Sequence, residues 1–228
     1  MGKLSETKVQ MVALKYLTQK YRRKAKRKRV FADIEVRTRR KVGGGRADGL
    51  LAYRNFWGGL RVVSMEAKSY NTLGAIRPQL SYKLLLWNSF RAGLLICLLS
   101  GAFMIWYEYE DLFWKYAIPI NTFVIGALLY AYISRHHFGH LSVDMIRQIS
   151  RYPANYRWLA ISRDALGALS QSKQKALVKI CRQESVGLIS VNYPGQVEEL
   201  VSAKVKVKWS GSFLTAYARE KGILQEIG

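Results

Sequence analysis

The sequence predicts an α/β domain that is interrupted by a transmembrane helical hairpin. Residues 4–21 repeat apolar side chains with helical periodicity, and three strand-like runs follow them. Two long apolar runs fill residues 84–134, and residues 141–228 return to strand-like and helical patterns. A length of 228 residues suits one such domain with a membrane element.

The chain is strongly basic. It carries 37 Lys and Arg against 15 Asp and Glu, a formal net charge of +22. Such a charge usually indicates a polyanionic partner, with nucleic acid as the first candidate and an anionic membrane surface as the second. Half of the residues are apolar, which excludes a disordered basic tail. Two cysteines are too few for a disulfide framework or a four-cysteine zinc site, and they fit a reducing compartment.

Most of this charge lies in the first 80 residues, which have 20 Lys and Arg against five acids. Residues 4–21 predict a helix that Ser5 can cap. Residues 22–29 come next, and we expect them to bind nucleic-acid phosphates. A solvated helix end or a lipid-headgroup contact is the alternative. The seven candidate nucleic-acid-binding residues are Arg22, Arg23, Lys24, Lys26, Arg27, Lys28 and Arg29.

Three strands are predicted next, over residues 30–38, 46–53 and 60–69. The runs are rich in β-branched and apolar residues, and glycines separate them. Three consecutive glycines at 43–45 make the first turn, and Gly-Gly at 58–59 makes the second.

The last two strands carry a set of residues suited to phosphodiester chemistry. Asp48 lies on one, and Glu66 and Lys68 lie two apart on the other, so both leave the same face. The two carboxylates can converge on one Mg²⁺, which prefers carboxylates and waters. The metal would lower the pKa of a bound water, and Lys68 would stabilise negative charge. Singly, each residue is more simply read as a turn carboxylate or as part of a cross-strand ion pair; together, in this order and after a glycine turn, they favour a site.

Residues 43–53 (GGGRADGLLAY) and 62–69 (VVSMEAKS) resemble the PD-(D/E)xK nuclease superfamily, which includes restriction-endonuclease-like domains and archaeal Holliday-junction resolvases. The resemblance implies a restriction-endonuclease-like mixed sheet flanked by helices. It implies Asp48 and Glu66 as ligands of Mg²⁺ or Mn²⁺, and Lys68 as a catalytic residue.

Two further residues are candidates by this resemblance. Glu6 lies on the preceding helix, where members often place an auxiliary acid. The RecB-like exonuclease branch has a Gln and a Tyr on the helix after Glu-x-Lys, usually three residues apart. Gln79 and Tyr82 have two residues between them, so Gln79 is an auxiliary candidate or an ordinary helix residue. Ala47 stands where the family usually has a proline.

The apolar runs predict two membrane-spanning helices within residues 84–134, each close to the roughly 20 residues that a bilayer needs. Their connector at 108–111 is acidic and their outer flanks are basic. The positive-inside rule then places both termini in the cytoplasm, and we expect a two-pass protein of the bacterial inner membrane. A buried hairpin in a soluble core is the alternative. The charged N-terminus predicts no signal peptide.

Residues 156–162, 186–191 and 201–209 predict further strands, and residues 172–184 predict an amphipathic helix. The last strand would place Lys204, Lys206 and Lys208 on one face, as a protected edge or as a phosphate contact.

We therefore expect residues 1–82 and 141–228 to be two halves of one nuclease-like domain. The predicted function is a membrane-anchored, metal-dependent nuclease that hydrolyses nucleic acid, DNA more readily than RNA, on the cytoplasmic side. The alternative is a non-catalytic membrane tether or adaptor, with a degenerate nuclease fold that binds nucleic acid or a partner protein. A third reading is a lipid-binding protein. A homodimer or higher oligomer, an activating partner, and endo- or exonucleolytic action all stay open.

Overall fold

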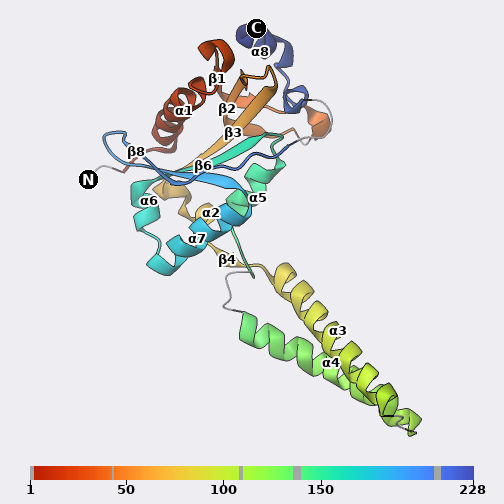
Figure 1. Cartoon of the computed structure of the whole chain (residues 1–228). Coiled ribbons are helices and arrows are strands. Elements are labelled where there is room, and N and C mark those ends of the chain that lie inside the picture. The colour runs from red at the N-terminus through yellow and green to blue at the C-terminus, as the bar shows by residue number, and fades with distance from the viewer. Residues whose placement is uncertain (1–2, 43, 108–109, 136–139, 208–211) are drawn as a thin grey trace. The chain divides into compact units, whose positions relative to one another are not determined.

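A computed structural model describes residues 3–42, 44–107, 110–135, 140–207 and 212–228. The chain forms two compact units (Figure 1). One is an α/β unit made from residues 1–78 and 143–228, and the other is a helical hairpin unit made from residues 79–142.

The α/β unit is built on a six-stranded mixed sheet, so the predicted α/β class is confirmed. The spatial order is β1-β2-β3-β6-β7-β8. β1, β2 and β3 form an antiparallel meander, β6 and β7 continue the sheet parallel to β3, and β8 closes it antiparallel to β7. The strands are β1 (Phe31–Arg37), β2 (Arg46–Arg54), β3 (Leu60–Lys68), β6 (Tyr156–Ser162), β7 (Val186–Val191) and β8 (Val197–Val201).

Five of these strands confirm the predicted runs, whereas the strand predicted over residues 201–209 is wrong. β8 ends at Val201, and residues 202–207 form no strand. Their alternation of Val and Lys has no neighbouring strand to pair with. Instead, the Lys204 N–H donates to the Ser185 carbonyl and the Lys206 N–H donates to the Asn155 carbonyl. Lys208 lies outside the described residues.

Helix α1 (Glu6–Arg22) covers one face of the sheet (Figure 1). It begins after Ser5, whose side chain accepts a hydrogen bond from the Lys8 N–H, so the predicted helix and its cap are confirmed. The indole N–H of Trp158 donates to the Tyr21 hydroxyl at 2.9 Å, inside this core. The core joins side chains of α1 to side chains of β2 and β3: Val9, Ala13, Leu17 and Tyr21 with Leu51, Tyr53, Val63 and Met65.

The opposite face of β1–β3 is covered by the C-terminal segments η5 (Phe213–Ala216) and α8 (Glu220–Ile227). Their buried side chains pack against Leu50, Ala52 and Val62. The remaining helices of the unit are η1 (Lys26–Lys28), η2 (Arg40–Val42), η3 (Tyr70–Thr72), α2 (Leu73–Ile76), α5 (Asp144–Arg151), α6 (Arg163–Gly167) and α7 (Gln171–Gln183).

The hairpin unit consists of α3 (Tyr82–Trp106) and α4 (Leu112–Ser134), with short strands β4 (Gln79–Leu80) and β5 (Leu141–Ser142) at its base. Both helices are long and apolar enough to cross a bilayer, as judged by length and composition. They approach closely at small residues, because a Cβ added to Gly93 would lie 2.7 Å from the Phe123 carbonyl oxygen. The orientation in a membrane stays a prediction.

Gly187 on β7 offers a test of the core. A Cβ at this position would overlap the buried Trp158 ring, so we expect Gly187→Ala to lower the stability of the α/β unit by roughly 1–3 kcal/mol. The matched control is Gly222→Ala at an exposed position of α8, where the added Cβ meets nothing within 4 Å and the substitution improves helix propensity. Thermal unfolding in detergent should separate the two variants; equal melting temperatures would contradict this packing.

Candidate active site

The structure brings together four of the predicted site residues. Gly49 of β2 pairs with Met65 of β3, so the next position in this antiparallel register places Asp48 opposite Glu66. Lys68 follows Glu66 by two residues on the same side of β3. Glu6 comes from the first turn of α1. Two strands and one helix thus position the four side chains.

Lys68 lies among three carboxylates. Its Nζ donates to Glu6 Oε1 at 2.9 Å, and it lies 3.8 Å from Asp48 Oδ2 and 4.0 Å from Glu66 Oε2. Only 9% of Lys68 is exposed. When all three acids are ionised, the cluster has more negative than positive charge, although the chain as a whole is +22. Such a cluster attracts a further cation.

Hydrogen bonds fix the two partly exposed carboxylates. Asp48 Oδ2 accepts from the Ala67 N–H at 2.9 Å, and the Asp48 carbonyl accepts from the Gln10 side chain on α1. Glu6 Oε2 accepts from the Thr72 hydroxyl at 2.9 Å. The side chains are therefore oriented before any ligand binds, as a binding site requires.

Glu66 is the most unusual member. It is 1% exposed, and its Oε1 has no hydrogen-bond partner within the described part of the chain. Burial, followed by the nearby charge of Asp48, raises the pKa of Glu66 to about 8, and Lys68 opposes this shift. A buried carboxylate oxygen without a donor, beside a second carboxylate, is an arrangement that a divalent cation would satisfy.

The carboxylates of this cluster suit Mg²⁺, which keeps bound waters, better than a metal ion whose ligands all come from the protein. Over the described ranges, no group of three or more His, Cys, Asp and Glu residues is placed to hold a metal ion. Mg²⁺ commonly binds through one or two carboxylates and keeps several waters. Asp48 and Glu66 can supply these ligands, while Lys68 occupies the space toward Glu6.

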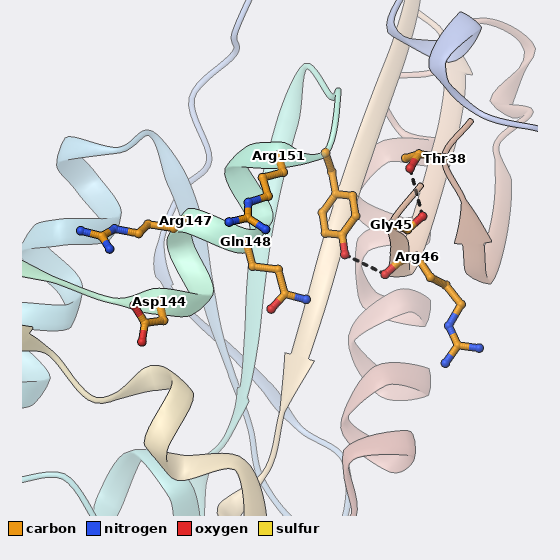
Figure 2. Close-up of a pocket in the computed structure, with 8 residues that line it drawn as sticks. Thr38, Gly45, Arg46, Asp144, Arg147, Gln148 and Arg151 are labelled. Atoms are coloured by element: carbon orange, nitrogen blue, oxygen red, sulfur yellow. Dashed lines mark hydrogen bonds between the residues drawn. The ribbon is translucent and has the colours of Figure 1, made fainter. Parts of the chain in front are cut away.

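A cavity of about 710 Å³ is lined in part by Tyr152, whose pKa is influenced by burial and by the charge of Glu66. Arg147, Gln148 and Arg151 of α5 line one side, and Thr38 and Arg46 lie across from them (Figure 2). Tyr152 connects the cavity to the carboxylates. Its hydroxyl donates to the Arg46 carbonyl at 2.8 Å, and burial together with the charge of Glu66 raises its pKa. A cavity lined by three arginines and Asp144 therefore reaches Tyr152, which is close to the buried carboxylate.

Gln148 and Tyr152 were missed by the sequence reasoning, which selected Gln79 instead. Gln148 and Tyr152 have three residues between them, the spacing that the RecB-like resemblance calls for, and they follow the hairpin rather than precede it. The helix expected at Gln79 is wrong, because Gln79 lies in β4 and pairs with Ser142. Pro78 favours the extended conformation of Arg77, where α2 ends. The spacing of Gln148 and Tyr152 could have been found in the sequence beyond the apolar runs.

The seven predicted nucleic-acid-binding residues lie at the end of α1 and around η1, and all seven are exposed. Within the described residues, no carboxylate lies within ion-pair distance of them. Their charge is thus available to a partner, and binding of nucleic acid by these residues stays a prediction.

No protein-family model, curated protein or solved structure matches the chain.

The raised pKa of Glu66 predicts a pH dependence of stability. A carboxyl group with a higher pKa in the folded state favours folding when protonated, so its contribution is complete below 4.5 and is lost as pH rises through about 8. In EDTA, we expect the melting temperature of the wild type to fall relative to Glu66→Gln between pH 5 and 9. Replacement of exposed Glu198 by Gln is the control. Parallel curves for wild type and Glu66→Gln would contradict the burial of an unpaired carboxylate.

Proposed function

We propose that this chain is a metal-dependent nuclease, anchored in a membrane by α3 and α4, that hydrolyses phosphodiester bonds of nucleic acid. The observation that carries the proposal is the placement of Lys68 within 4.0 Å of three carboxylates, one of them buried with an oxygen that has no hydrogen-bond partner among the residues that the structure describes. The chain order supports the resemblance to PD-(D/E)xK nucleases: α1, then β1 to β3, then α5, β6, α7 and β7.

Asp48 and Glu66 would hold Mg²⁺ or Mn²⁺, which supplies a water of lowered pKa and stabilises charge on the phosphodiester. Lys68 would stabilise the negative charge that develops on the attacked phosphate. Its burial strengthens this interaction, because little water screens it. Glu6 holds the ammonium group in place through the 2.9 Å hydrogen bond. Each residue thus has a role that its contacts support.

The cavity beside Tyr152 would take the strand on one side of the cleaved bond. Arg147 and Arg151 are suited to phosphate oxygens, since the guanidinium group can donate two parallel hydrogen bonds. Gln148 lies between them on α5 and offers an amide to the same strand. The family resemblance favours DNA over RNA. The arginines that line the cavity could contact the phosphates of either nucleic acid.

The surface of the hairpin unit supports a membrane anchor. Leu98 of α3 is 62% exposed and Leu128 of α4 is 66% exposed, and many large apolar neighbours are exposed as well. Exposure of this much apolar surface to water is unfavourable, whereas exposure to lipid is not. With basic flanks outside the two runs, we place both parts of the α/β unit on the cytoplasmic side of a bacterial inner membrane.

Catalysis is tested with detergent-purified protein. We expect wild type to cleave at least one of plasmid, linear, branched or single-stranded DNA, or RNA, with Mg²⁺ or Mn²⁺ and not with EDTA. Asp48→Ala and Glu66→Gln should abolish cleavage, and Lys68→Ala should reduce the rate by roughly 100-fold or more. Glu198→Gln, at an exposed position of β8, is the control.

Salt-sensitive binding without cleavage under any divalent metal would favour the non-catalytic tether instead. Cleavage that persists in Asp48→Ala would show that the nuclease site lies elsewhere.

The cavity is tested with Arg151→Ala. We expect a higher KM and a smaller change in kcat, because the residue would bind a flanking phosphate rather than the reacting group. The salt dependence of binding should also weaken by about one unit of slope. Exposed Arg163 on α6 is the matched control. An unchanged KM in Arg151→Ala would remove the cavity from the substrate path.

A further inference from the structure

The turn between β2 and β3 exposes two aromatic side chains. Phe56 is 76% exposed and Trp57 is 88% exposed. Their rings pack edge to face, with centroids 5.6 Å apart, and neither is covered by the core. Two adjacent exposed aromatic residues at the tip of a hairpin cost free energy in water, so they point to a ligand with apolar surface.

The basic segment 22–29 lies beside this turn. Ala25, in the middle of the segment, forms an antiparallel bridge with Asn55 at the start of the turn. Lys26, Arg27 and Arg54 line a cavity of about 220 Å³ next to Gly58. The aromatic pair and the basic segment are therefore parts of one surface, which we call the β2–β3 turn surface.

We propose that the β2–β3 turn surface binds a single-stranded segment of nucleic acid, whose bases stack on Phe56 and Trp57 while its phosphates contact residues 22–29. Proteins that bind single strands combine aromatic stacking with a basic groove in this way. The inference deepens the proposed function, since the bound strand serves as substrate only if the chain is a nuclease.

The position of the surface specifies the kind of substrate. Asn55 follows Asp48 by seven positions along the chain, which at the usual strand rise is about 23 Å. That distance corresponds to roughly seven base pairs of a duplex. A substrate with a duplex near the carboxylates and an unpaired arm at the tip, such as a fork or a flap, would span this distance.

Trp, Phe and basic residues also occur where proteins contact a bilayer surface. The cavity lined by Lys26, Arg27 and Arg54 can hold a phosphate close to the aromatic pair, which is the combination that single-strand binding uses. Single-stranded nucleic acid is therefore the proposed ligand, and lipid is an outcome of the test.

Binding is tested with the full chain in detergent and EDTA, using a fluorescent single-stranded oligonucleotide and a blunt duplex of the same sequence. We expect the Phe56→Ala/Trp57→Ala double variant to bind the single strand roughly 5- to 150-fold more weakly, with duplex binding little changed. Trp57→Phe should retain most of the affinity, because it keeps an aromatic face. Tyr193→Ala, which removes an exposed aromatic residue from the β7–β8 turn, is the matched control.

Wild-type affinity of the double variant for the single strand would overturn the proposal. The fluorescence of Trp57 is obtained as the difference between wild type and Trp57→Phe. If, in addition, vesicles that contain brominated lipid quench this fluorescence, the surface binds a membrane instead. With Mg²⁺, wild type should prefer a forked duplex to a blunt one, and the double variant should lose this preference. Loss of single-strand binding in the double variant, with no cleavage by any form, would support the surface and reject the nuclease.

Discussion

Strand β3 is hydrogen-bonded on both sides, antiparallel to β2 and parallel to β6, and this pairing fixes the position of Glu66. A central strand cannot shift its register by one residue without moving every side chain to the other face. Asp48 therefore stays opposite Glu66, and Lys68 stays on the same side two residues later. Because β3 lies inside the sheet, between β2 and β6, Glu66 is also shielded from water. The unusual electrostatics of the site thus follow from strand pairing rather than from a mobile loop.

The protein combines a negative site with a positive surface. Excess carboxylate at the ends of β2 and β3 favours a divalent cation, while the arginines of α5 and the basic segment 22–29 favour phosphates. Cleavage of a phosphodiester would use both. The positive surface binds the anionic backbone of the nucleic acid, and a cation at the negative site stabilises the further negative charge that develops during cleavage. The aromatic turn at the other end of the meander is the surface proposed for bases. One β-hairpin thereby links the proposed chemistry to a proposed choice of substrate.

Much of the fold followed from local patterns in the sequence. Alternating residues and glycine turns located β1 to β3, and the spacing of Glu66 and Lys68 correctly placed them on one side of a strand. Tertiary pairing decided what local patterns could not. Residues 202–207 alternate like a strand yet bond to loops, and the Gln–Tyr pair beside the site is separated from Lys68 by the whole hairpin unit. Burial of Glu66, and hence its raised pKa, depends on β6 and is invisible in the sequence.

The most direct test of this account is the number of protons released when Mg²⁺ binds. Calorimetric titrations of the full chain in buffers of different ionisation enthalpy measure this number. Since burial and Asp48 raise the pKa of Glu66 to about 8, we expect wild type near pH 6 to release close to one proton per metal ion, and progressively fewer above pH 8. Glu66→Gln should release none. Failure of the wild type to bind Mg²⁺, or equal proton release by both proteins, would contradict a metal site built on Glu66.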